Sequence, residues 1–115
     1  ESFFLRPAQA GNHPPSPTAH VVIERSPSLE AGASFALGTA PVTIGRSGEN
    51  AIALSADEFA SGHHARIEPL RDGLWIVDLG STNGTYVNGA QVVGRERLGE
   101  GDLVRVGETE LRIGR

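Results

Sequence analysis

Short runs of β-branched and aliphatic residues, separated by turn-forming residues, follow one another from His20 to the end of the chain. No window shows a sustained helical period of apolar residues, and Gly, Asn, Asp and Ser recur between the runs. This pattern is typical of an all-β sandwich or barrel. The runs that we expect to be strands are 20–25, 33–37, 41–45, 50–54, 64–70, 74–79, 85–88, 91–93, 97–98, 103–106 and 109–113.

The run 74–79 is apolar on both of its faces. Trp75, Val77 and Leu79 alternate onto one face, whereas Leu74 and Ile76 lie on the other. Strands that are covered on both sides carry such continuous apolar runs. We therefore expect this run to be a central strand.

The stretch 78–89, which reads DLGSTNGTYVNG, contains two Asn-Gly pairs, Asn83-Gly84 and Asn88-Gly89. Asn-Gly beside an apolar run is the strongest short-range signal of a tight chain reversal. Ser81 and Thr82 precede the first pair, so a loop of hydroxyls and an amide is expected at the end of a strand. Such a loop suits recognition of a polar ligand.

Residues 1–19 differ in composition from the rest. Pro7, Pro14, Pro15 and Pro17 lie among small polar residues, a mixture that sustains neither helix nor ladder hydrogen bonds. We expect residues 1–19 to be a flexible Pro-rich tail or linker and residues 20–115 to be one folded domain.

Length, charge and cysteine content narrow the possible functions. A chain of 115 residues fits a single domain. The formal net charge of −4 argues against a nucleic-acid partner, and no apolar run is long enough for these residues to insert into a membrane. The absence of Cys fits a reducing compartment, so a cytoplasmic location is expected, and a membrane tether outside this chain is left open.

Several motifs occur in a characteristic order: Gly45-Arg46, the run 50–54, Ser61 with His64, the run 75–79, Ser81-x-Asn83-Gly84-Thr85, Asn88-Gly89, and Gly101-Asp102 before Gly107. In this order and over roughly 21–113, they resemble the forkhead-associated (FHA) domain, and more loosely small bacterial FHA signalling proteins. The resemblance implies a two-sheet β-sandwich of about eleven strands with ligand loops at one end. It also implies an interaction module that reads phosphothreonine peptides, without cofactor or catalysis.

The partner implied by this resemblance is a phosphothreonine-containing protein, such as a Ser/Thr kinase or its substrate. Phosphothreonine brings a charge of roughly −1.5 to −2 and three acceptor oxygens, so its site needs donors and positive charge. Arg46 is the first expected phosphate contact, because a guanidinium can grip phosphate with two parallel bonds. By resemblance, the hydroxyls of Ser61 and Thr82 also face the phosphate, and Asn83 clamps the ligand's main chain.

Gly62 is expected in the site through its open backbone N–H groups, although many members of the family carry Asn, Arg or Lys at this position. Gly45, His64, Gly84 and Asn88 are expected to support the loops, His64 through hydrogen bonds of its ring. Peptide selection further along the ligand could involve Phe59 and the loop 47–49.

Three alternatives stay open at this point. Arg46 could simply pair with Glu49 on the surface. The chain could bind a partner through a sheet face without phosphate, for which the glycine at position 62 is the main support. A hydrolase or metal site could use His63, His64, Asp57 and Ser61, but adjacent strand residues point to opposite faces and no further ligands complete such a site.

Overall fold

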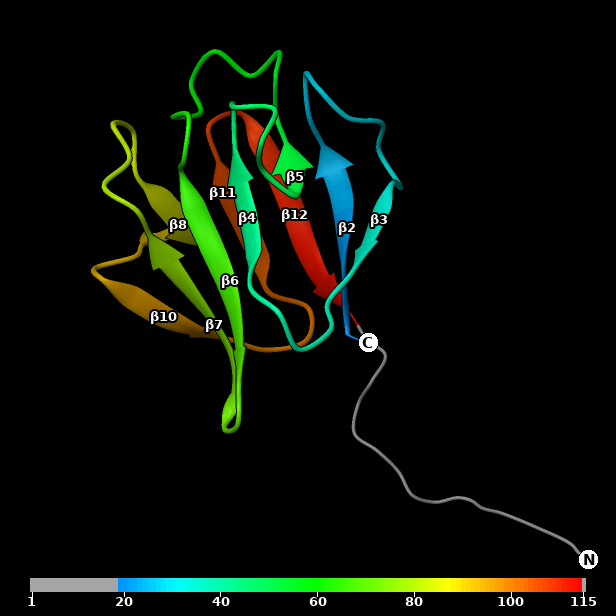
Figure 1. Ribbon diagram of the computed structural model, residues 1–115, viewed down its shortest axis with the longest axis vertical. Coiled ribbons are helices and arrows are strands. Elements are labelled where there is room, and N and C mark those ends of the chain that lie inside the picture. Colours follow the sequence, from blue (N-terminus) through cyan, green and yellow to red (C-terminus); the bar gives the residue numbers. More distant parts are fainter. Residues whose placement is uncertain (1–18, 115) are drawn as a thin grey trace, which may run out of the picture.

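Two β-sheets pack face to face in the computed structural model, which describes residues 19–114 (Figure 1). The five-stranded sheet has the order β10 (Arg95–Leu98), β7 (Gly73–Asp78), β6 (Ala65–Leu70), β4 (Val42–Gly45) and β5 (Ile52–Ala53). The six-stranded sheet has the order β3 (Ser34–Ala36), β2 (His20–Arg25), β12 (Thr109–Gly114), β11 (Leu103–Val106), β8 (Thr85–Val87) and β9 (Ala90–Gln91). The expected all-β sandwich is thereby confirmed.

Each run expected from the sequence overlaps one of these strands. The largest shifts fall on three runs: 50–54 is shortened to the two residues of β5, 91–93 is replaced by β9, and 97–98 is extended to the four residues of β10. All three are edge strands, which pair on one side only. Edge strands carry charged and small residues that the apolar pattern does not register.

Strand β7 lies between β10 and β6, but its two faces differ. Ile76 is fully buried in the core, whereas Trp75 and Val77 are only half-buried on the outer face. The guanidinium carbon of Arg95 lies 4.6 Å from the centroid of the Trp75 ring. On the second apolar face of this strand, an arginine side chain, not another layer of structure, therefore covers Trp75.

The core is aliphatic and is supplied by the inward positions of both sheets. Ile44, Ile67 and Ile76 from one sheet are 0–1% exposed. Val21, Leu111 and Val104 from the other sheet are 0% exposed. Removing side chains of this size from water stabilises the fold by about 1.5–3 kcal/mol each, so this packing gives the loops a rigid base.

The two ends of the sandwich have different contents. The connections β4–β5, β5–β6, β7–β8 and β11–β12 lie together at one end, whereas His20 and Gly114 pair across β2 and β12 at the other (Figure 1). The expected tail lies outside the described residues except for Ala19. The carbonyl of Ala19 accepts the Leu37 N–H at 3.0 Å, so this residue belongs to the folded part. Within residues 19–114, no helix has the length and apolar character needed to cross a membrane.

Candidate functional site

Three loops converge at one end of the sandwich: 46–51 after β4, 54–64 before β6, and 79–84 after β7. Ser61 joins all three. Its carbonyl accepts the N–H of Arg46 at 2.8 Å, and its hydroxyl oxygen accepts the N–H of Thr82 at 3.0 Å. Four residues predicted to bind phosphate, Arg46, Ser61, Gly62 and Thr82, are therefore brought together by one backbone hydrogen bond and one bond to the Ser61 hydroxyl.

Gly45 is required here by close approach. A Cβ at this position would lie 2.3 Å from the carbonyl oxygen of Gly62, which no real contact tolerates. The Gly62 carbonyl also accepts the N–H of Ser47 at 3.1 Å and the side-chain amide of Asn50 at 2.8 Å. A second bond from Asn50 to the Ser47 carbonyl, also 2.8 Å long, completes the link between the first two loops.

His64 is fully buried and connects the second loop to the third. Its Nδ1 accepts the backbone N–H of Ser61 at 3.0 Å, so the ring proton resides on Nε2. Nε2 then donates to the carbonyl of Gly84 at 2.8 Å. This geometry agrees with the supporting role expected for His64, since both ring nitrogens are occupied by main-chain groups.

Gly84 adopts a φ of +87°, and a Cβ at this position would lie 2.9 Å from the side-chain amide of Gln91. The third loop therefore turns where only glycine fits easily.

Asp78, at the end of β7, holds the third loop from its start. Its carboxylate accepts four hydrogen bonds, from the N–H groups of Gly80 and Ser81 and from the hydroxyls of Ser81 and Thr85. Burial would raise the pKa of Asp78, but these hydrogen bonds outweigh it and hold the pKa below its ordinary value. The carboxylate is thus kept charged, and it fixes the path of residues 79–84.

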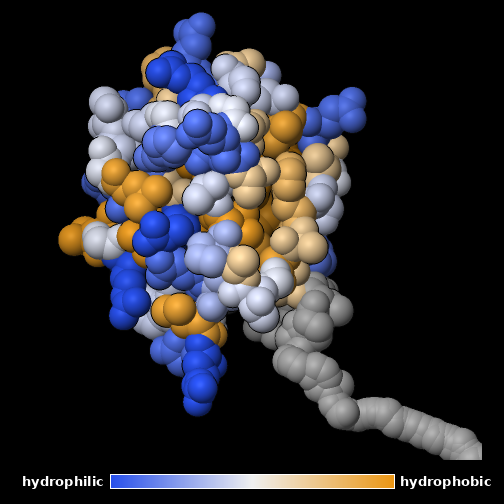
Figure 2. Space-filling view, in the orientation of Figure 1, coloured by the Kyte–Doolittle hydropathy of each residue, from blue (hydrophilic) through white to orange (hydrophobic). Residues whose placement is uncertain are grey.

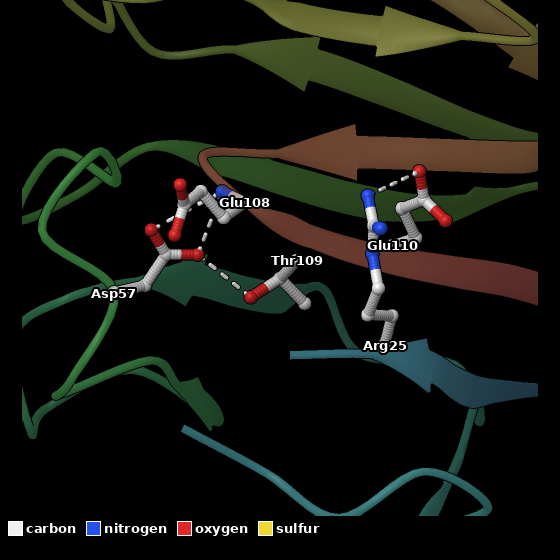
Figure 3. A network of polar contacts seen from close by, with 5 residues as sticks. All are labelled: Arg25, Asp57, Glu108, Thr109 and Glu110. Carbon is white, nitrogen blue, oxygen red and sulfur yellow. Dashed lines mark hydrogen bonds and ion pairs between the residues drawn. The ribbon is translucent and has the colours of Figure 1, made fainter. Parts of the chain in front are cut away.

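Asp57 anchors the second loop to the six-stranded sheet (Figure 3). It is fully buried, and its carboxylate accepts the Glu108 N–H at 2.9 Å and the Thr109 hydroxyl at 2.7 Å. It also accepts the N–H of Phe59 at 3.1 Å. The Phe59 carbonyl in turn accepts the side-chain amide of Asn83 at 2.9 Å, so Asp57 helps to fix the position of Asn83.

We refer to Asn50, Asp57, His64 and Asp78 as the loop anchors. Of these four residues, only His64 was expected from the sequence to support the site. A local signal existed for Asp57 and Asp78, because both accept backbone N–H groups two residues ahead, the pattern of an Asx-turn. The bonds that Asp57 and Asp78 accept from residues further along the chain cannot be recognised from the local sequence.

The structure places Asn88 apart from this cluster. It follows the far end of β8, where its amide donates to the Asp102 carboxylate at 3.0 Å and its oxygen accepts the Leu103 N–H at 3.0 Å. Asn88 has a φ of +50°, which Asn tolerates better than most residues. Its side chain therefore stabilises the β8–β9 turn against the start of β11, which differs from the expected support of the ligand loops.

The residues of the hydrolase hypothesis do not form a catalytic arrangement. The hydroxyl of Ser61 accepts from Thr82, and His64 contacts Ser61 through its backbone N–H. His63 is exposed, with its Nε2 4.0 Å from the Glu49 carboxylate. Among residues 19–114, no three His, Cys, Asp or Glu side chains lie close enough to hold a metal ion.

The ligand-facing side chains lie outside the anchors. Arg46, Thr82 and Asn83 are exposed, and Ser61 and Gly62 are half-buried. The end of the sandwich therefore presents a guanidinium, two hydroxyls and an amide on a fixed base. Such a set of donors suits an anionic ligand that is attached to a polypeptide.

Known proteins are similar to this chain in sequence. The family model described as FHA domain matches residues 42–107. The chain is 40% identical over 83 residues to the FHA domain-containing protein FhaB of Mycolicibacterium smegmatis, covering 72% of this chain and 53% of that protein. It is 35% identical over 113 residues to the glycogen accumulation regulator GarA of Mycobacterium tuberculosis, covering 91% of this chain and 67% of that protein.

Solved structures show the same architecture. One, from a structural and functional analysis of phosphothreonine-dependent FHA domain interactions, matches with a TM-score of 0.74 and 28% identity, over 85% of this chain and 96% of that one. Another is Mycobacterium tuberculosis EmbR in complex with a low-affinity phosphopeptide, with a TM-score of 0.74 and 28% identity over 84% of this chain and 24% of that one. The chain spans about half the length of the FhaB relatives, at 53% and 52%.

Proposed function

This chain belongs to the FHA domain family, and from that membership we propose that it binds phosphothreonine-containing peptides through the three converging loops. FHA domains are interaction modules that bind phosphothreonine peptides. The proposal therefore contains no catalytic step and needs no cofactor. The expected partner is a phosphorylated protein, either a Ser/Thr kinase or its substrate, and the expected location is the cytoplasm.

One observation carries the assignment of the phosphate contact. Arg46 is exposed at the end of β4, and Glu49, the carboxylate that could have neutralised it, lies near His63 instead. Within residues 19–114, the Arg46 side chain forms no ion pair and no hydrogen bond. A guanidinium that is left available at the junction of three loops supports the binding of a doubly charged phosphate.

The neighbouring donors complete this proposal. Because the Ser61 oxygen accepts from Thr82, the Ser61 hydroxyl proton is left to donate to a phosphate oxygen. Asn83 uses one amide proton on the Phe59 carbonyl, so its second proton and its oxygen can hold the ligand's main chain beside the phosphothreonine. Gly62 has no side chain and so contributes only its backbone to the site. Space is open where a Cβ at this position would lie.

The test is calorimetric titration with peptide libraries that are matched in phosphothreonine, phosphoserine and unmodified forms. We expect saturable binding of the phosphothreonine set, with a Kd on the order of micromolar. Arg46→Ala should weaken it roughly ten- to hundredfold, because a charge-assisted hydrogen bond contributes about 1.5–3 kcal/mol.

Arg112→Ala is the matched control, since Arg112 is exposed on the six-stranded sheet and pairs with Glu24 at 3.0 Å. It should leave the Kd unchanged. Equal binding of phosphorylated and unmodified peptides by a folded protein would contradict the proposal and favour a phosphate-independent module of the same fold.

A further inference from the structure

The outer face of the five-stranded sheet gathers arginines around the sole tryptophan of the chain. Val77 of β7 is paired with Arg95 of β10 on one side and with Arg66 of β6 on the other. Trp75 is paired in the same way with Arg97 and Glu68. Side chains in one row of a sheet share a face. We call these six residues the Trp75 face.

The Trp75 ring is fixed in place. Its indole N–H donates to the carboxylate of Asp72 at 3.0 Å, and the guanidinium carbons of Arg95 and Arg97 lie 4.6 and 6.0 Å from the ring centroid. Arg97 also donates to the Asp72 carbonyl. The arginines are therefore held over a rigid aromatic platform, so little conformational freedom would be lost when they bind a ligand.

Two arginines of this face form no ion pair with any described residue, although the Asp72 carboxylate lies near both of them. Arg66 pairs with Glu68 at 2.7 Å, but within residues 19–114 Arg95 and Arg97 form no ion pair with a carboxylate. Arg71 is a further exposed arginine at the tip of the β6–β7 hairpin. The pKa of Asp72 is lowered, first by the hydrogen bond from Trp75 and also by the positive charges of Arg97 and Arg95.

The outer face of the other sheet is different. There Arg25 pairs with Glu110 at 3.3 Å, and Arg112 pairs with Glu24 at 3.0 Å. Arg105, which is also exposed on that sheet, lies with its guanidinium carbon 4.4 Å from the centroid of the Tyr86 ring and forms no ion pair with a carboxylate within residues 19–114. The Trp75 face thus places two arginines without an ion pair, Arg95 and Arg97, on one strand, whereas two of these three arginines of the other sheet are paired.

Apolar side chains border the Trp75 face. Val93, just before β10, is 89% exposed, and Leu70, at the end of β6, is 44% exposed. Figure 2 shows separate orange spots among blue residues on the left of the domain, the side on which β7 and β10 lie in Figure 1. The border fits a polypeptide that carries aliphatic residues beside its acids.

We propose that the Trp75 face is a second docking surface, which binds an extended acidic segment of a protein partner without any phosphate. Arg95 and Arg97 are two residues apart on one strand, so their positions repeat at roughly 6.6–6.8 Å. An extended segment with Glu or Asp at every second position places carboxylates at the same spacing. The surface lies on a sheet face, whereas the proposed phosphate site lies on the loops at the end of the sandwich.

The probe for this proposal is an unphosphorylated peptide of alternating Glu and Thr residues, with a peptide of alternating Lys and Thr as its control. Trp75 fluorescence reports binding directly, because no other tryptophan contributes. We expect a saturable change with the acidic peptide only, which weakens as salt is added. Backbone amide shifts in a two-dimensional NMR spectrum should map to β10, β7 and β6.

Charge reversal supplies the matched variants. Arg95→Glu combined with Arg97→Glu should weaken binding roughly tenfold, the size expected for two exposed charge contacts. Arg25→Glu combined with Arg112→Glu changes the net charge equally on the other sheet and should leave the Kd within about twofold. If the first pair disturbs folding, Arg95→Gln with Arg97→Gln removes the charges more gently and should still weaken binding severalfold.

Arg46→Ala separates this proposal from the phosphothreonine site, since it should leave binding of the acidic peptide intact. The proposal is overturned if both charge-reversed pairs weaken binding equally, or if the shifts map to the loops around Arg46. Binding of vesicles that contain phosphatidylserine, with no binding of the acidic peptide, would also overturn it and point to a membrane surface instead.

Discussion

The core between the sheets and the anchors beneath the ligand loops are both largely buried, but different forces hold them. The core is built from aliphatic residues such as Ile44, Ile76 and Leu111, all 0% exposed. Three of the loop anchors, Asn50, Asp57 and His64, are 7, 0 and 0% exposed, and each acts through hydrogen bonds of fixed direction.

This difference separates stability from site geometry. Hydrophobic burial has no direction and is shared among many side chains, so a change at one core position is spread over its neighbours. A hydrogen bond from Asn50 or His64 sets the position of one particular carbonyl, at Gly62 or Gly84. Changes in the core should lower the free energy of unfolding, whereas changes at the anchors should act mainly on binding.

The largest effect on stability is expected from Ile76→Ala. Removing this fully buried side chain from β7 should lower the free energy of unfolding by about 2–5 kcal/mol, measured by urea denaturation. Phosphopeptide affinity of the folded fraction should stay within about twofold, because the aliphatic side chain of Ile76 packs in the core and holds no ligand loop by a hydrogen bond. Val93→Ala is the control, since Val93 is 89% exposed and should change stability by less than about 0.5 kcal/mol. A large loss of affinity in Ile76→Ala would contradict the proposal that the core determines stability and the loop anchors determine the geometry of the site.

A comparison of two glycines gives the next largest effect. Gly45→Ala would bring a Cβ to 2.3 Å from the Gly62 carbonyl and push the first two loops apart, at a cost of about 1–3 kcal/mol. We expect phosphopeptide affinity to fall about tenfold or more in the same variant, because both loops carry proposed phosphate contacts. Gly62→Ala places its Cβ in open space and should change stability and affinity little, as measured by denaturation and calorimetry. Similar behaviour of the two variants would contradict the importance of this close approach.

The smallest expected effect concerns acid and Asp78. The folded-state pKa of this carboxyl is held below its ordinary value of 3.8, so charged Asp78 stabilises the loop at pH values above that figure. The contribution is lost as the pH falls through the lowered folded-state pKa, and for a half-exposed group it should stay below about 1 kcal/mol. NMR titration of the side chain and amide exchange at Gly80 and Ser81 between pH 5 and pH 2, roughly the range over which such carboxyls titrate, would measure it.

Asp78→Asn is the control for that titration, because the amide has no charge to lose in this range. The same acid-induced exchange at Gly80 and Ser81 in wild type and variant would show that Asp78 does not hold the loop.

The fold was largely predictable because its signals are local. Alternation of apolar residues and the Asn-Gly pairs identified the strands and their connections, and the motif order gave the family. The outer face of β7 was harder, since Trp75 is covered by Arg95 and Arg97 from a strand whose own sequence is mostly charged. A pattern that counts apolar residues cannot register cover supplied by arginine side chains.

The anchors were missed for a different reason. Asp57 is buried because Glu108 and Thr109, more than 50 residues further along the chain, donate to it. The Asx-turn at Asp57 is a local signal of a turn, but nothing near this residue in the sequence predicts that its carboxylate is buried while Glu58 is exposed. Asn88 is the reverse case, since it lies close to Asn83 in the sequence but forms the turn after the far end of β8, beside Leu103.

The pairing of His20 with Gly114 has a consequence for how the domain can be used in larger proteins. β2 begins and β12 ends at the end of the sandwich opposite the ligand loops. The two strand ends are hydrogen-bonded neighbours, so the whole sandwich can be spliced into a surface loop of another protein with little distortion of the host. Insertion of this domain into another protein should therefore leave its ligand loops unchanged.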